Sequence, residues 1–173
     1  ITPNADLAID EVGVPKKVAR KAKVLESVTK DNYERIVKMI AENGNHTYPG
    51  VKWIILDGDK LNKAAGNYRM VRDQDEEWIR SNLQIGSKIM RDVIDGDIGL
   101  FNRAPSLHRQ SILAMRCRIL EAKSLGMNPT VCIPFNADYD GDAMKLHFVQ
   151  SEEAIADAKK WMQLDKNLSL IHI

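Results

Sequence analysis

The chain has 173 residues, of which 44% are hydrophobic and 28% charged, a composition typical of a globular domain with its own core. Its 25 Lys and Arg residues nearly balance its 24 Asp and Glu residues, so any binding of nucleic acid must be local rather than driven by a global field. No apolar run approaches the roughly 20 residues of a bilayer span, and the first residues lack a signal-peptide pattern. These features exclude a membrane protein and predict an intracellular one.

Two helices are predicted in the first 45 residues. Proline in a first turn favours a helix across residues 15–22, whose basic side chains we assign to a solvated surface. Thr29 is the expected N-cap of a second helix across residues 31–42, where apolar residues recur at helical spacing.

The rest of the chain is richer in expected strands. A short apolar run predicts one strand across residues 51–56, whereas residues 59–83 show no clear pattern. Further β-forming runs, separated by Gly, Pro or Asp, predict strands across residues 88–94, 98–102, 112–120, 131–135 and 144–149. Ser151 is placed to cap a last helix that continues to about residue 164. Cys117 and Cys132 fall within apolar runs and are expected to be buried, reduced thiols rather than zinc ligands.

The segment Asn136-Ala-Asp-Tyr-Asp-Gly-Asp142 carries the strongest chemical signal. On an extended strand its alternate carboxylates would lie about 6.6 Å apart, too far to hold one ion at the magnesium–oxygen distance of about 2.0–2.1 Å. The segment must therefore curl, and Gly141 can take the positive φ that a curl requires. Close carboxylates raise one another's pKa, a cost that a divalent cation removes. We predict a magnesium site formed by Asp138, Asp140 and Asp142.

Other interpretations of this acidic segment were compared by spacing. A calcium-binding EF-hand needs glycine and glutamate where Ala143 and Val149 stand. A phosphatase of the haloacid dehalogenase type also has D-x-D-G after an apolar strand, with Asp138 as nucleophile, but Asp142 replaces the threonine of that family. The spacing alone is equally compatible with a solvated acidic turn. A non-catalytic barrel module that binds a partner subunit is a further alternative.

A second motif lies about thirty residues upstream of the acidic segment. Leu100-Phe-Asn-Arg-Ala-Pro-Ser-Leu-His-Arg109, followed by Asn136-Ala-Asp-Tyr-Asp-Gly-Asp-Ala-Met144, resembles the active-centre signatures of the largest subunit of cellular DNA-directed RNA polymerases. Ser151-Glu-Glu-Ala154 and Ile9-Asp-Glu-Val-Gly-Val-Pro15 resemble the archaeal and eukaryotic branch more than the bacterial one. The resemblance covers roughly residues 1–167.

The resemblance implies an α+β fold built on a double-psi β-barrel that is incomplete at its N-terminal edge. We expect a helical insertion and a C-terminal helix beside this barrel. The expected division is a first barrel strand region at 1–14, a helical and loop insertion at 15–83, the barrel core at 84–150, the terminal helix at 151–167 and a sequencing artefact at 168–173. The last six residues resemble a translated sequencing adapter, and the absence of an initial methionine suggests that residues precede Ile1.

The resemblance also implies the chemistry. The three aspartates hold the catalytic magnesium for attack of the RNA 3′-hydroxyl on a ribonucleoside triphosphate, and a second magnesium arrives with the nucleotide. Arg103 lies near the incoming ribose, Asn136 reads its hydroxyls, and Pro105 fixes the turn that orients Arg103. Tyr139 replaces the phenylalanine common in the family, so its hydroxyl needs a partner.

The implied partners are those of a larger enzyme. They are the second-largest subunit, which supplies a facing barrel, other polymerase subunits, template DNA, nascent RNA and ribonucleoside triphosphates. The zinc sites of the family lie outside these residues, and the isolated chain is expected to be inactive. The expected location is the cytoplasm, with the nucleoid, for an archaeal protein and the nucleus for a eukaryotic one.

Overall fold

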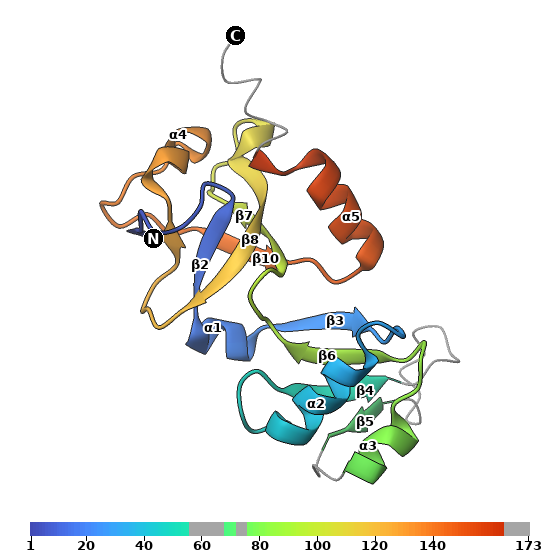
Figure 1. Cartoon of the computed structure of the whole chain (residues 1–173). Helices are drawn as coiled ribbons and strands as arrows, with labels where there is room; N and C mark the ends of the chain where they lie inside the picture. The colour runs from blue at the N-terminus through green and yellow to red at the C-terminus, as the bar shows by residue number, and fades with distance from the viewer. Residues whose placement is uncertain (56–67, 72–75, 165–173) are drawn as a thin grey trace. The chain divides into compact units, whose positions relative to one another are not determined.

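The computed structural model describes residues 1–55, 68–71 and 76–164. They form two compact units (Figure 1). We call the unit of Ile1–Ala19 and the described residues after Val93 the acidic-loop unit, and the unit of Arg20–Val93 the inserted unit. Both contain helices and sheet, which confirms the α+β class. No helix of the described residues is long and apolar enough to span a bilayer.

The acidic-loop unit contains a six-stranded mixed sheet. In spatial order its strands are β1 (Thr2–Pro3), β9 (Gly126–Met127), β2 (Glu11–Pro15), β8 (Ile112–Leu120), β7 (Ile98–Asn102) and β10 (Lys145–Phe148). Two pairs, β1 with β9 and β2 with β8, are parallel, and the other three are antiparallel. Among the described residues β1 and β10 end the sheet, so the strands do not close into a barrel.

Short helices surround this sheet. They are η1 (Arg109–Ser111), η2 (Pro129–Val131), α4 (Cys132–Phe135) and α5 (Glu152–Trp161). The predicted cap of the last helix is confirmed, because the Ala154 backbone N–H donates to the Ser151 hydroxyl at 3.2 Å. The expected helix after residue 15 is α1 (Lys16–Lys21), although Pro15 ends β2 rather than starting the helix.

The strand predicted across residues 131–135 is wrong. Those residues form the end of η2 and the whole of α4. Asn128 starts the helical turn by accepting from the Thr130 backbone N–H at 3.0 Å, and Pro129 follows it at the first position. Pro134 has no N–H to give to a sheet ladder. This local cap outweighs the β-preference of the apolar residues.

The inserted unit contains an antiparallel four-stranded sheet. Its spatial order is β3 (Lys23–Ser27), β6 (Lys88–Asp92), β4 (Val51–Ile55) and β5 (Tyr68–Met70). Residues 88–94 fall within the expected barrel core of 84–150, whereas β6 pairs here with β3 and β4. The strand expected at 51–56 is present as β4; Leu56 lies outside the described residues.

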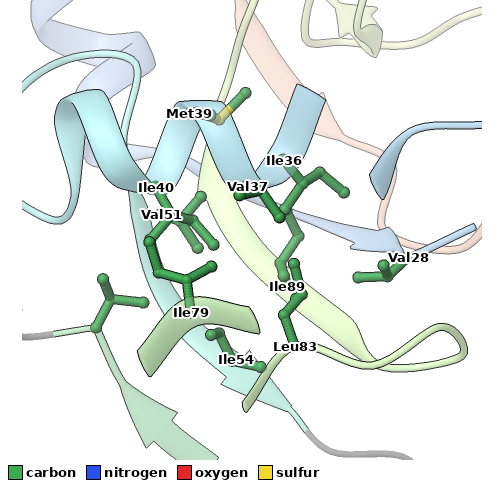
Figure 2. Close-up of a cluster of buried hydrophobic side chains, with 11 residues drawn as sticks. Val28, Ile36, Val37, Met39, Ile40, Val51, Ile54, Ile79, Leu83 and Ile89 are labelled. Atoms are coloured by element: carbon green, nitrogen blue, oxygen red, sulfur yellow. The ribbon is translucent and has the colours of Figure 1, made fainter. Parts of the chain in front are cut away.

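Two helices, α2 (Tyr33–Asn43) and α3 (Glu76–Asn82), pack against this sheet (Figure 2). Ile36, Val37 and Ile40 recur at helical spacing and bury one face of α2 against Ile54 and Ile89 of the strands. This face is the apolar pattern that predicted the helix.

The predicted cap of α2 is one turn too early. Asn32, not Thr29, is the N-cap residue. The Asn32 side chain accepts from the Thr29 backbone N–H at 2.7 Å and donates to the Ser27 carbonyl at 2.8 Å. These bonds stabilise a turn through residues 30–32, so the helix begins only at Tyr33.

Charged side chains of the inserted unit form ion pairs around the buried Arg91 and Asp92. Arg91 and Glu26, whose side chains are 7% and 16% exposed, form an ion pair. Glu26 also contacts Arg35, and Lys23 contacts Asp92. Because each carboxylate here faces a cation, these buried charges are compensated within the unit.

Candidate metal centre

The sheet register brings the two sequence motifs together. Strand β10 pairs antiparallel with β7, and Lys145 lies opposite Asn102. The residues that follow β7 must therefore meet the residues that precede β10. Arg103 follows β7 and Asp142 belongs to the loop that leads into β10, so strand pairing alone places them side by side.

An aromatic contact is a second link between the two motifs. The rings of Phe101 and Phe135 meet edge to face, with centroids 5.4 Å apart and planes at 78°. Both side chains are buried. Phe101 lies two residues before Arg103, and Phe135 directly precedes Asn136. This pair was not predicted, although each phenylalanine lies in or beside a motif and is apolar, a signal for the buried support of the site.

The acidic loop is curled as predicted. Asn136 has φ 47° and ψ 45°, a left-handed conformation that asparagine tolerates, and it ends α4. Its backbone N–H donates to the Ile133 carbonyl at 3.0 Å. Gly141 has φ 128°, which few other residues adopt. These two backbone positions turn a segment of alternating aspartates away from the extended form.

The curl brings the three carboxylates together. One oxygen each of Asp138, Asp140 and Asp142 lies within 4.8 Å of the others. Asp138 and Asp140 are exposed, whereas Asp142 is half-buried. Carboxylate oxygens are the ligands that magnesium, calcium and manganese prefer. The group can therefore hold a divalent cation, and the donor set fits the predicted ion.

Arg103 forms a two-point ion pair with Asp142. Its Nε donates to Oδ2 at 2.6 Å and its Nη2 to Oδ1 at 3.2 Å. The two side chains are 21% and 19% exposed. The Asp138 backbone N–H donates to the same Oδ2 at 3.2 Å, which draws the two ends of the loop together.

Asp140 and Asp142 are electrostatically different. Hydrogen bonding with Asp138, and the negative charge of that neighbour, raise the pKa of Asp140. The hydrogen bonds from Arg103, followed by the bond from the Asp138 backbone N–H, lower the pKa of Asp142. The loop thus combines a carboxylate that disfavours its charge with one whose charge is stabilised.

Tyr139 anchors the loop from its other side. Its hydroxyl donates to the Met127 carbonyl at 3.2 Å and accepts from the Cys132 thiol at 3.2 Å. The expectation that this hydroxyl needs a partner is confirmed. Burial, and then the bond with Cys132, raise the pKa of Tyr139. Both cysteines are free as predicted, but only Cys117 is buried; its burial raises its pKa to about 12. Cys132 is half-buried because it starts α4 instead of lying in a strand.

The remaining predicted residues flank the triad. Pro105 lies in the exposed turn after β7, where the Ala104–Pro105 bond is cis and the Ser106 hydroxyl donates to the Asn102 side chain at 2.8 Å. Asn136 is exposed at the start of the loop. The described contacts join Arg103 to the aspartates, but they do not join Pro105 or the Asn136 side chain to them.

Comparison with known proteins assigns the class. The chain belongs to the family RNA polymerase Rpb1, domain 2, whose model matches residues 1–164. It is 43% identical over 169 residues to the DNA-directed RNA polymerase subunit Rpo1N of Sulfolobus acidocaldarius and 40% identical to that of Thermococcus celer. Each match covers 97% of this chain and 18% of the relative.

A eukaryotic relative is equally similar. The chain is 42% identical over 168 residues to the DNA-directed RNA polymerase III subunit RPC1 of Saccharomyces cerevisiae, across 97% of this chain and 11% of the relative. The resemblance to archaeal and eukaryotic largest subunits is thereby confirmed. The chain spans less than a fifth of the length of these relatives.

Proposed function

We propose that this chain is the part of an RNA polymerase catalytic subunit that carries the metal-binding aspartates, and that it serves DNA-templated RNA synthesis from ribonucleoside triphosphates. The observation that carries the proposal is the convergence of Asp138, Asp140 and Asp142 beside Arg103, the residue that follows β7. A solvated acidic turn gives no reason for a second motif to be placed at the same point.

The residues divide the work as follows. Magnesium held by the three aspartates, together with a second ion carried by the nucleotide, supplies activation of the attacking hydroxyl and neutralisation of the leaving pyrophosphate. Asp138 and Asp140 present exposed oxygens, and Asp142 is oriented by Arg103. The protein contributes positioning and electrostatics rather than a nucleophile.

Substrate selection belongs to the flanking residues. Arg103 has donors that can reach a ribose hydroxyl, and Asn136 offers an exposed amide that both donates and accepts. A 2′-hydroxyl also donates and accepts, so these two side chains suit a ribonucleotide. Pro105 shapes the turn that carries Arg103.

The larger assembly follows from the family. We propose that the six mixed strands belong to a double-psi β-barrel completed in the whole subunit, and that the second-largest subunit supplies the facing barrel. Template DNA and nascent RNA are the nucleic-acid partners. The location is the cytoplasm with the nucleoid in an archaeon, or the nucleus in a eukaryote.

The test is Asp140→Ala in the full-length subunit within an assembled enzyme. Because a metal ion contributes several kcal/mol at the transition state, templated RNA synthesis should fall by at least about 1,000-fold. Asp157→Ala, an exposed aspartate on α5, is the matched control and should leave synthesis unchanged. Normal synthesis by the Asp140 variant at ordinary magnesium concentration would refute the metal assignment and favour the non-catalytic module.

The phosphatase alternative loses its main support. It required an apolar strand directly before Asp138, and the structure has the helical turn α4 there. Incubation of the isolated chain with a generic phosphate ester gives a direct check. We expect no turnover; hydrolysis that disappears with Asp138→Asn alone would restore the phosphatase.

A further inference from the structure

The carboxylate of Asp142 is already largely occupied by donors. A carboxylate offers about four lone-pair positions to donors or metal ions. Three are used here, two on Oδ2 by Arg103 Nε and the Asp138 backbone N–H, and one on Oδ1 by Arg103 Nη2. Two of the three bonds come from the guanidinium of Arg103. One position, on Oδ1, is left, so a cation that takes Asp142 as a ligand either shares the carboxylate with that side chain or displaces it.

The other two aspartates are in a different situation. Asp138 and Asp140 are exposed, and Arg103 acts on them only through its charge, whereas its hydrogen bonds go to Asp142. An incoming ion can reach both without breaking an ion pair. Asp142 is thus the one member of the triad whose availability depends on another residue.

We propose that Arg103 is a positioning residue that competes with the metal ion for Asp142. It holds the carboxylate through two hydrogen bonds and lets it go when the ion binds, which releases the guanidinium toward the nucleotide ribose. This inference rests on the proposed function, since it assigns the released side chain to the substrate. Metal and nucleotide binding are then coupled, and each strengthens the other by the same factor.

The charges at the site determine whether removal of the Arg103 guanidinium strengthens or weakens metal binding. Among the side chains, the site has three carboxylates against one guanidinium with Arg103, and three carboxylates without it. A single positive charge about 6 Å from a divalent ion opposes its binding by about tenfold in water. Removal of the guanidinium should therefore tighten metal binding, the reverse of what loss of a ligand does.

The experiment measures Mn²⁺, a magnesium substitute, bound to the 173-residue chain by electron paramagnetic resonance. We expect Arg103→Gln to bind Mn²⁺ about tenfold more tightly than the unmodified chain, and Asp142→Asn to bind it more weakly. Arg116→Gln is the matched control, because Arg116 forms the same two-point pair with Asp10, at 2.7 and 3.0 Å, in the same unit. Its Mn²⁺ affinity should not change.

A second measurement needs no variant and so does not depend on folding of the substituted chain. The side-chain Nε–H of Arg103 is followed by nuclear magnetic resonance during addition of Mg²⁺. We expect its signal to shift and its exchange with water to accelerate as the site fills, while the Nε–H of Arg116 stays unchanged. An unchanged Arg103 signal in a saturated site overturns the inference.

The outcomes separate the inference from the proposed function. If the chain binds Mn²⁺ and Arg103→Gln leaves the affinity unchanged or weakens it, only the competition by Arg103 is refuted. If neither chain binds Mn²⁺, the metal site itself fails and the inference fails with it. Binding that appears only in Arg103→Gln supports the competition strongly.

Discussion

In the inserted unit Arg91 and Glu26 are buried against each other, whereas in the acidic loop Asp138 and Asp140 are exposed beside further negative charge. The first arrangement is complete in itself, because every carboxylate described in that cluster contacts a cation. The second has three carboxylates against one guanidinium among its side chains, so it keeps negative charge that can hold a cation. Compensated charge serves the fold, and uncompensated charge leaves a place for a ligand.

The largest effect should come from breaking the compensated cluster. Glu26→Ala removes the carboxylate that faces Arg91 and Arg35, so the buried Arg91 loses this counter-charge. Loss of one member of a buried pair costs about 3–5 kcal/mol. The measurement is the free energy of unfolding, obtained from hydrogen exchange of the β6 amides at increasing urea concentration.

Glu121→Ala is the control for that variant. Its pair with Lys16 is exposed, with side chains 79% and 49% accessible, so its loss should cost no more than about 1 kcal/mol. Equal costs for the two variants would contradict the distinction between buried and solvated charge.

The next effect concerns the anchor of the loop. Tyr139→Phe removes the hydroxyl bonded to Met127 and Cys132, and should cost about 1 kcal/mol. It should also speed amide exchange at Asp140 and Gly141. Tyr33→Phe, which removes a 3.3 Å bond to the Leu83 carbonyl in the inserted unit, is the matched variant and should leave those two amides unchanged.

A smaller effect on stability is expected from a substitution in the loop itself, and here stability should rise rather than fall. Asp140→Asn removes a charge that its neighbours repel, so in a chelator the urea midpoint should rise. With Mg²⁺ the unmodified chain should have the higher urea midpoint, because a bound ion stabilises only the chain that keeps the ligand. Asp157→Asn on α5 is the control. A lower midpoint for Asp140→Asn in the chelator would show that the loop needs that charge for folding.

The smallest effect is a difference between the pKa values of Asp140 and Asp142. Carbon-13 resonances of the carboxyl groups should show Asp140 titrating above the usual 3.8 and Asp142 below it. The lowered pKa means that the Asp142 pair stabilises the fold above pH 3.8 and is lost as the pH falls through the lowered value. The raised pKa of Asp140 means that its ionisation costs stability as the pH rises through that value. Arg103→Gln should raise the pKa of Asp142. The pKa of Asp140 should still be the higher of the two.

Part of this structure could be predicted because the signals were local. The helical spacing of Ile36, Val37 and Ile40, the cap at Ser151 and the need for a positive φ at Gly141 are properties of a few neighbouring residues. The strands at 98–102 and 112–120 were predicted with the bounds that the structure shows. Resemblance to a known family added the link between the two motifs.

The misses have non-local or competing causes. Lys88–Asp92 was correctly predicted as a strand but assigned to the wrong sheet, since sequence spacing does not say which strand is the partner. The apolar residues 131–135 became a helical turn because Asn128 caps it. The ion pair of Arg103 with Asp142 depends on the register of β7 with β10, which only the folded chain specifies.

The parallel pairing of β2 with β8 has a consequence for synthesis. Val12 pairs with Cys117, 105 residues later in the chain. Every strand of the inserted unit lies between them in the sequence. That unit is therefore synthesised completely before β8, the partner of β2, has been made. The acidic loop follows β8 and is made later still. The site is thus completed after the inserted unit has been made, on a sheet with long-range pairings, a kind of contact that slows folding.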